Sequence, residues 1–381
     1  MKFLIAPDSF KGSLTAKEAA QAIKAGVEKI FPDADYELVP MADGGEGTVQ
    51  SLVDATEGQL VTKQVHNPLN KLVDAHYGLL GNSNTAVIEM AEASGIQYVD
   101  EQTKNPLITT TYGTGELILD VVKHGVDQII IGIGGSATTD GGAGMAQALG
   151  AKLLDKDGNE IGFGGGPLAD LDRIDISGIA PEVAKVKILI ASDVTNPLTG
   201  KDGSAAVFGP QKGATPEMVK TLDANLHHYA EVIKRDLGKD LEMAAGAGAA
   251  GGLGIGLMAF TNSTMEKGVE IALKYSQLAE RAAGTDYAFT GEGSIDFQTK
   301  FGKTPYGVAT TVKKVAPAAP VIVLAGHIGK DVDSLYEDGI MDAIFATPNG
   351  AKPLDQAIKD AKADVAITAE NIARLIKVNH G

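Results

Sequence analysis

Short runs rich in apolar residues, separated by amphipathic stretches, mark both ends of the chain. Such runs, bounded by turn residues, are typical of buried strands in a parallel sheet. Five of them are predicted as strands, namely Lys2–Ala6, Tyr36–Val39, Tyr287–Thr290, Val321–Ala325 and Ala343–Ala346. The stretches between them have helical periodicity, so strand and helix alternate.

The first of these helices has clear signals at both of its ends. Thr15 and Glu18 have the spacing of a capping box, and Pro32 closes the pattern. The apolar stripe of this helix consists of Ala20, Ile23, Val27 and Ile30. Further helices are predicted over Thr48–Ala55 and from Thr304 and Leu354.

The pattern changes near residue 60, where short alternating runs are separated by turn residues such as Asn67-Pro68. These runs predict an antiparallel meander made of Val61–Val65, Leu72–Tyr77 and Ala86–Met90. A helix over Glu116–Lys123 and strands over Gln128–Ile133 and Val186–Ala191 follow. Thr215 is then expected to cap a long helix that ends before Gly238.

This order of elements predicts an α/β protein with two domains. The two ends of the chain, residues 1–60 and 285–381, are expected to form one doubly wound domain with a parallel sheet. Residues 61–284 are expected to form a second α/β domain inserted into it.

Composition narrows the possible chemistry. The chain has no cysteine, which excludes disulfides, thiolate metal sites and cysteine nucleophiles. Its net charge of −16 argues against nucleic acid as a partner, because nucleic-acid binding depends largely on Lys and Arg neutralising phosphates. The 47 glycines cluster, which indicates backbone-lined binding loops.

One uncharged stretch, Met243–Met265, is long enough to span a bilayer. It contains six glycines and ends in Thr261-Asn262-Ser263-Thr264, so a buried glycine-rich loop leading into a helix is the preferred prediction. No signal peptide is visible after Met1, because the apolar run there is too short. We therefore expect a cytoplasmic protein with no membrane partner.

The strongest local signal is the loop after the strand at 128–133. The sequence passes from apolar strand through a loop of glycines and hydroxyl residues into a helix of small residues, which is typical of a phosphate-binding loop. A tight packing turn is the alternative interpretation. The residues predicted to bind phosphate or nucleotide here are Gly134, Gly135, Ser136, Thr138, Asp140, Gly141 and Gly142.

Two further loops follow the first two strands, at the strand ends where open α/β sheets bind ligands. They place carboxylates, hydroxyls and a lysine together, and Lys11 is predicted to hold a substrate carboxylate. The predicted substrate-binding residues are Asp8, Ser9, Lys11, Ser13, Asp43, Gly44, Gly45 and Glu46. Ordinary helix capping is the alternative for both loops.

Acids also follow the strands at 186–191 and 287–290. Phosphoryl transfer to a hydroxyl needs an acid that accepts or orients the proton, and oxygen ligands for Mg²⁺. Asp193 and Asp296 are predicted as the catalytic acids, with Glu292 and Asp296 on the metal side. Asn196 and Lys303 are assigned to the phosphate-binding set.

These segments together resemble the bacterial glycerate kinases of the class I type. The matching segments are PDSFKGSLTA at 7–16, PMADGGEGT at 40–48, NPLITTTYGTGELI at 105–118, IGIGGSATTDGGAGM at 131–145, ASDVTNPL at 191–198, GAGAAGGLG at 246–254 and TGEGSIDFQTKFGKTPYGVA at 290–309. They run in order along nearly the whole chain, which makes the resemblance far more specific than any single glycine loop.

The resemblance implies a kinase that uses ATP and Mg²⁺ to phosphorylate D-glycerate, with the 2-phosphate favoured over the 3-phosphate. It also implies a discontinuous Rossmann- or flavodoxin-like domain with an inserted α/β domain. The oligomeric state is left open, and a homo-oligomer is compatible with the sequence. Two other classes remain as alternatives, a two-lobed solute-binding protein and an aldolase or isomerase of hydroxy acids that needs no nucleotide.

Overall fold

The computed structural model describes residues 1–380, with side chains described through Val378, as two compact units. The terminal unit comprises Met1–Asp43, Gln50–Gly58 and the chain from Val269 onward. The inserted unit comprises Gly44–Val49 and Gln59–Gly268. The chain therefore returns from the inserted unit to the terminal unit at residue 269, whereas the sequence analysis predicted this boundary at residue 285.

The segment that follows this boundary belongs to the terminal unit because its apolar side chains complete that unit's core. Ala272, Leu278 and Ala282 are buried in one cluster with Val308 and Val312. Sequence periodicity does not reveal which sheet such a short helical segment covers.

The terminal unit contains a five-stranded parallel sheet in the order β13-β12-β11-β1-β2. Its strands are β1 (Lys2–Ile5), β2 (Asp35–Leu38), β11 (Tyr287–Ile295), β12 (Val321–Ile328) and β13 (Ala343–Ala346). Its helices are α1 (Ala16–Glu28), α10 (Gly268–Tyr275), α11 (Leu278–Ala282), η4 (Phe297–Phe301), α12 (Thr304–Val315), η5 (Val332–Leu335) and α13 (Leu354–His380), and α2 (Thr48–Ala55) begins in the inserted unit. If these five strands are numbered 1 to 5 in chain order, their order in the sheet is 2-1-3-4-5, which is the flavodoxin-like arrangement. The switch point of this arrangement lies between β1 and β11.

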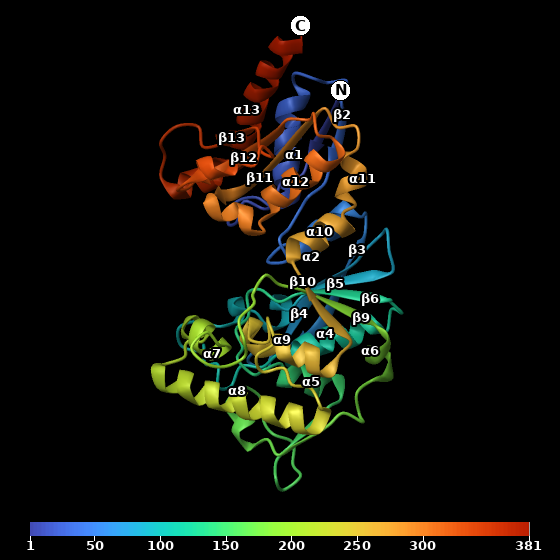
Figure 1. Cartoon of the computed structure of the whole chain (residues 1–381), viewed down its shortest axis with the longest axis vertical. Coiled ribbons are helices and arrows are strands. Elements are labelled where there is room, and N and C mark those ends of the chain that lie inside the picture. The colour runs from blue at the N-terminus through green and yellow to red at the C-terminus, as the bar shows by residue number, and fades with distance from the viewer. Residues whose placement is uncertain (381) are drawn as a thin grey trace. The chain divides into compact units, whose positions relative to one another are not determined.

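Helices cover both faces of this sheet, which is why its strands are apolar on both sides. Phe3 and Ile5 of β1 pack with α1 and α13, which lie side by side in Figure 1. Leu4 points to the opposite face and packs with Val308 and Val312 of α12. The capping box of Thr15 and Glu18 is present at the start of α1, as predicted.

The inserted unit contains a six-stranded mixed sheet in the order β10-β9-β6-β5-β4-β3. Its strands are β3 (Gln59–His66), β4 (Leu72–Leu79), β5 (Thr85–Glu89), β6 (Gln128–Gly132), β9 (Lys187–Ala191) and β10 (Ser263–Glu266), with a separate hairpin of β7 (Lys152–Leu154) and β8 (Arg173–Asp175). Its helices are α3 (Ala91–Ser94), η1 (Ile96–Tyr98), α4 (Tyr112–Val122), α5 (Ala143–Leu149), η2 (Pro167–Asp170), α6 (Pro181–Lys185), α7 (Ser204–Phe208), η3 (Pro210–Lys212), α8 (Pro216–Leu237) and α9 (Ala249–Phe260). The predicted antiparallel meander is present in β3, β4 and β5, and β5 also pairs in parallel with β6.

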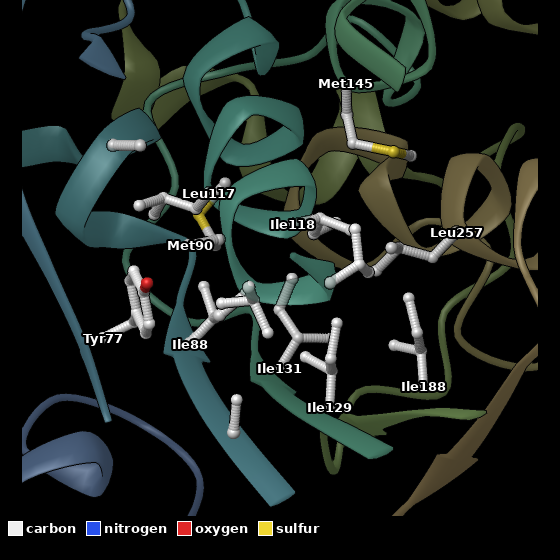
Figure 2. Packing of buried hydrophobic residues seen from close by; sticks show 14 of the residues in the cluster. Tyr77, Ile88, Met90, Leu117, Ile118, Ile129, Ile131, Met145, Ile188 and Leu257 are labelled. Carbon is white, nitrogen blue, oxygen red and sulfur yellow. The ribbon is translucent and has the colours of Figure 1, made fainter. Parts of the chain in front are cut away.

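One face of this sheet builds the main core of the inserted unit. Ile88, Ile129 and Ile188 come from three neighbouring strands and lie in one layer in Figure 2. Ile118 of α4 and Leu257 of α9 pack over them. A second cluster lies beyond these helices, where α8 packs on α9 and α5 through Leu222, Leu226, Tyr229, Ile255 and Ala146.

The structure confirms the predicted fold class, an α/β protein with a flavodoxin-like domain built from both chain ends and a second α/β domain inserted. One strand prediction was too short. β11 runs on to Ile295, because β12 also continues and pairs with it as far as Ile328. Glu292 therefore lies within a strand, where the sequence analysis had placed it in a loop.

The glycine-rich segment at 243–265 forms a loop leading into the helix α9, as preferred from the sequence; the loop is buried at 246–248, whereas Met243 and Ala245 are exposed. Its last residues form strand β10. Within residues 1–380, no helix is long and apolar enough to cross a membrane.

Candidate active site

The switch point of the terminal unit carries a buried aspartate, Asp8, just beyond β1. Its backbone N–H donates to the Gly291 carbonyl at 2.8 Å, which fixes the loop beside β11. Its carboxylate accepts hydrogen bonds from the backbone N–H of Ser9 at 2.6 Å and from the Thr304 hydroxyl at 2.5 Å. Burial, reinforced by the negative charge of Asp43, raises the pKa of Asp8 to about 6. The protein therefore holds a carboxyl group here that titrates near neutral pH.

A second carboxyl group of the same kind, Glu292, comes from β11. Its Oε2 lies 3.8 Å from the Lys303 ammonium, and its Oε1 accepts a hydrogen bond from the Thr299 hydroxyl at 3.3 Å. Burial raises the pKa of Glu292 to about 7, although Lys303 opposes the shift. Asp8 and Asp43 raise it further, so the three acids of the terminal unit act on one another electrostatically.

Asp296, predicted as both a catalytic acid and a metal ligand, has a structural task at the start of η4. Its carboxylate accepts a hydrogen bond from the Gln298 backbone N–H at 2.9 Å, and Thr299 completes a capping box. The Lys303 ammonium lies 3.9 Å from the same carboxylate. Lys303 thus lies beside both Glu292 and Asp296 and connects the two predicted acids.

The predicted substrate lysine, Lys11, is exposed and its ammonium lies 4.0 Å from the Asp43 carboxylate. Ser13 donates its hydroxyl to the Phe10 carbonyl at 3.0 Å and so closes the turn that presents Lys11. Ser9 is partly buried next to Asp8. The terminal unit therefore brings five predicted residues, Asp8, Lys11, Asp43, Glu292 and Lys303, to the carboxyl ends of its strands.

The inserted unit holds the remaining predicted loops. Gly44, Gly45 and Glu46 line a cavity of about 300 Å³ together with Gly134 and Gly135. Backbone packs closely here, since a Cβ placed on Gly132 would come 2.7 Å from the Gly44 carbonyl oxygen. The structure therefore brings a predicted substrate loop and the start of the predicted phosphate loop to one cavity.

The second half of the glycine loop is enclosed by protein. Asp140 has no exposed surface, and its carboxylate accepts hydrogen bonds from Thr111 N–H and Oγ1, both at 2.8 Å, and from the N–H groups of Gly142 and Gly144. Thr138 is equally buried, and a Cβ on Gly141 would come 2.7 Å from the Tyr229 ring. Direct ligand contact stays a prediction for Gly134, Gly135 and Ser136. It also stays a prediction for Thr138, Asp140, Gly141 and Gly142, which are all buried. Among the described residues the Thr138 hydroxyl has no hydrogen-bond partner.

The loop after β9 carries two of the predicted residues, Asp193 and Asn196. Asp193 is exposed, whereas Asn196 is partly buried and donates its side-chain N–H to the Asp202 carbonyl at 2.8 Å. The amide of Asn196 therefore holds the following turn. Its predicted contact with phosphate and the catalytic role of Asp193 both stay predictions.

Three residues with suitable chemistry were missed by the sequence analysis. The Thr304 hydroxyl is bonded to Asp8, and Glu89 lines the cavity with its pKa raised to about 7 by burial. Glu89 is the last residue of β5. The search for acids at the carboxyl ends of strands, which selected Asp8 and Asp193, would therefore have found it as well. Lys212 lies buried beyond the glycine loop, in a turn whose sequence gives no signal of this position.

Comparisons with known proteins agree over nearly the whole chain. The model of the glycerate kinase family matches residues 3–377. A glycerate kinase of Haemophilus influenzae is 50% identical over 99% of both chains. The glycerate 2-kinase of Escherichia coli K12 is also 50% identical, over 99% of this chain and 98% of its own.

A solved structure is similar in both sequence and fold. It is the crystal structure of a Salmonella typhimurium LT2 protein assigned as a glycerate kinase 2, with 49% identity and a TM-score of 0.91. The match covers 100% of this chain and 99% of the other. Together with the family match, these relatives show that the chain is a kinase and that it belongs to the glycerate kinase family.

Proposed function

We propose that this kinase transfers the γ-phosphoryl group of ATP to D-glycerate and releases 2-phosphoglycerate and ADP. The 50% identity to glycerate kinases over nearly the full length supports the substrate, and the name of the E. coli relative supports the 2-position. The observation in the structure that carries the proposal is the pair of buried carboxyl groups, Asp8 and Glu292, at the switch point of the terminal unit. This is the position where flavodoxin-like sheets bind their ligands.

The transfer needs a group that takes the proton of the glycerate hydroxyl as its oxygen attacks phosphorus. A general base works best when its pKa lies near the operating pH, which the buried Asp8 satisfies. Asp8 is also held in a fixed orientation by Ser9 and Thr304. We assign it the acceptor role, in preference to the exposed Asp193.

Glycerate is a carboxylate, so its recognition needs a cation near the acceptor. Lys11 lies on the loop that carries Asp8, and its exposed ammonium is 4.0 Å from Asp43. The neighbouring Ser9 is partly buried, and its hydroxyl is proposed as a second substrate-binding group. We assign Lys11 to the glycerate carboxylate, as the sequence predicted.

Mg²⁺ fits the acids of the terminal unit. Within residues 1–380, no group of three or more His, Asp or Glu side chains could hold a metal ion by itself. Kinases, however, usually hold Mg²⁺ through one or two carboxylates together with the phosphates of the nucleotide. Glu292, whose pKa is raised by burial and by two neighbouring acids, would serve as that ligand. When bound, the ion would supply positive charge that offsets the charge of the phosphates.

The remaining groups position phosphate. Lys303 lies between Glu292 and Asp296 and can neutralise a phosphoryl oxygen close to the metal ligand. In the inserted unit, Gly134, Gly135 and Ser136 line a cavity, and we assign their backbone N–H groups to an anion bound there. These roles need no further covalent chemistry, because phosphoryl transfer depends mainly on positioning and charge.

The test is ADP release by the purified full-length protein with ATP, Mg²⁺ and D-glycerate, with reactions lacking glycerate as the control. Phosphorus NMR of the product distinguishes the 2-phosphate from the 3-phosphate. ADP release that does not depend on glycerate would overturn the proposal. Binding of hydroxy acids without turnover would favour a solute-binding protein, and conversion of them without ATP would favour an aldolase or isomerase.

A further inference from the structure

A second cavity in the inserted unit, of about 350 Å³, also borders the glycine loop. Its walls include Gly134, Gly135 and Ser136 from the loop after β6, together with Lys212 at the end of η3 and Ala250 at the start of α9. Three segments that are distant in the sequence therefore meet around one space. The proposed function assigns a role only to the first of them.

Lys212 is the unusual residue of this cavity, because it is a lysine with a relative exposure of 1%. Its ammonium donates a hydrogen bond to the Thr138 carbonyl at 2.5 Å. An ammonium group carries three N–H donors, and this is the one hydrogen bond that it makes within residues 1–380. Lysine is among the residues least often buried without a charged partner.

The nearest acid does not account for the burial of Lys212. Asp140 acts on it electrostatically, but the two side chains form no ion pair among the described residues. The Asp140 carboxylate is already satisfied by four donors from Thr111, Gly142 and Gly144. Burial consequently outweighs Asp140 and lowers the pKa of Lys212 to about 7. Lys212 is therefore a buried lysine with no contacting anion among the described residues, and an anion in the cavity would favour its charged form.

Another lining residue of the cavity, Ala250, has an unusual backbone conformation. Ala250 has φ 53° and ψ 43°, a left-handed conformation that disfavours any residue with a Cβ. Gly251 and Gly252 continue this conformation into α9, and the Gly251 carbonyl accepts a hydrogen bond from Gly141 N–H. The strained turn is therefore tied to the same glycine loop that Lys212 supports through Thr138. Such strain persists where the surrounding structure fixes it, often at ligand sites.

We propose that the Lys212 ammonium binds phosphoryl oxygens in this cavity, beside the backbone N–H groups of Gly134, Gly135 and Ser136. The inference rests on the proposed function, which supplies two phosphate-bearing molecules, the nucleotide and the phosphoglycerate product. A bound phosphoryl group supplies the anion that the buried ammonium lacks. Lys212 is then a phosphate-binding residue of the kinase reaction, and its charge is the property that matters.

The experiment compares three variants of the full-length protein. Lys212→Met removes the charge and the donor, whereas Lys212→Gln removes the charge but keeps an N–H group for the Thr138 carbonyl. Lys239→Met is the matched control. Lys239 is also partly buried, has its pKa lowered by burial, and donates to the carbonyls of Met258 and Ala259, beside a different cavity.

Thermal stability without ligand is measured first, and then the stabilisation by ADP and by 2-phosphoglycerate, each added alone. We expect both Lys212 variants to fold, and to lose at least tenfold in affinity for one or both ligands. The kcat of both should fall by roughly 10²-fold or more. A loss of affinity for ADP alone would assign the site to the nucleotide. A loss of affinity for 2-phosphoglycerate alone would assign it to the product. Lys239→Met should bind both ligands like the parent.

The proposal is overturned if Lys212→Gln binds both ligands like Lys239→Met, since the hydrogen bond to Thr138 would then be the whole role of Lys212. If Lys212→Met fails to fold, Lys212→Gln decides the question in the same way. A parent protein that shows no glycerate-dependent ADP release is a different outcome. That result would contradict the proposed function itself. An active parent protein with fully active Lys212 variants would contradict only the role of Lys212.

Discussion

Two buried aspartates, Asp8 in the terminal unit and Asp140 in the inserted unit, show how surroundings give one residue type different tasks. Asp140 is completely enclosed and receives four hydrogen bonds, three of them from backbone N–H groups. Asp8 receives two, and burial together with the like charge of Asp43 raises its pKa to about 6. Burial also raises the pKa of Asp140, but its four hydrogen bonds oppose the shift. A carboxylate with all of its acceptor sites filled holds a loop together. One with fewer donors and a pKa near neutrality can exchange a proton.

The largest effect on catalysis is expected for Asp8→Asn. Loss of a proton acceptor should lower kcat by roughly 10²–10⁴-fold with a smaller change in KM. Thermal stability should be unchanged or slightly raised, because the substitution removes a buried charge that Asp43 repels. Steady-state kinetics and thermal unfolding measured on the same preparation check both points.

Asp193→Asn is the matched comparison for that prediction. If Asp193→Asn loses more kcat than Asp8→Asn, the acceptor is the exposed acid predicted from the sequence. Near-parental kcat in both variants would place the acceptor elsewhere among the acids of the protein.

Asp140→Asn should show the opposite profile, with a loss of stability. Its amide would place an N–H group against donors that now bind a carboxylate, which should cost about 2–3 kcal/mol in the free energy of unfolding. Chemical denaturation measures this directly. An equally stable variant with strongly reduced kcat per folded molecule would mean that Asp140 meets substrate, against the burial described above.

The pH dependence of stability offers a finer test of the acids in the terminal unit. The pKa of Glu292 is raised from 4.5 to about 7 in the folded protein, so the folded state binds more protons than the unfolded state between these values. Stability without ligand should therefore fall as pH rises from about 4.5 to about 7, and Asp8 adds to the fall between about 4 and 6.

Glu292→Gln should flatten this slope, and the stabilisation by Mg²⁺ with ADP should become smaller in the variant. The comparison is made by thermal unfolding at pH 5 and pH 8. An unchanged slope in Glu292→Gln would contradict the raised pKa, and an unchanged response to Mg²⁺ would remove Glu292 as the ligand.

The smallest effect is expected for Lys11→Met. Removing an exposed cation from the proposed glycerate site should raise the KM for glycerate more than about tenfold, near 1.4 kcal/mol of binding. The KM for ATP should stay close to that of the parent. Lys17→Met, which removes another exposed lysine of the terminal unit, bonded to Asp54, is the control. Equal KM values for glycerate in the two variants would contradict the role of Lys11.

Much of the architecture follows from local signals in the sequence. The capping box of Thr15 and Glu18, the helix from Thr215 to Gly238 and the antiparallel meander were predicted because each depends on residues close together in the chain. The end of β11 was missed because its extension depends on pairing with β12, and two glycines inside the strand gave the signal of a loop. The boundary near residue 269 was missed for a similar reason, since it depends on which core Ala272 and Leu278 join.

The sequence by itself determined the α/β class, the family resemblance and the chemical content of the loops, because these are written in residue types, order and short spacings. Only the tertiary structure decided which of those residues are buried, and burial is what sets their chemistry. It buried the second half of the glycine loop, gave Asp8 and Glu292 pKa values near neutrality, and enclosed Lys212 beside the glycine loop. Desolvation depends on neighbours that are distant along the chain, so local sequence patterns could not predict it.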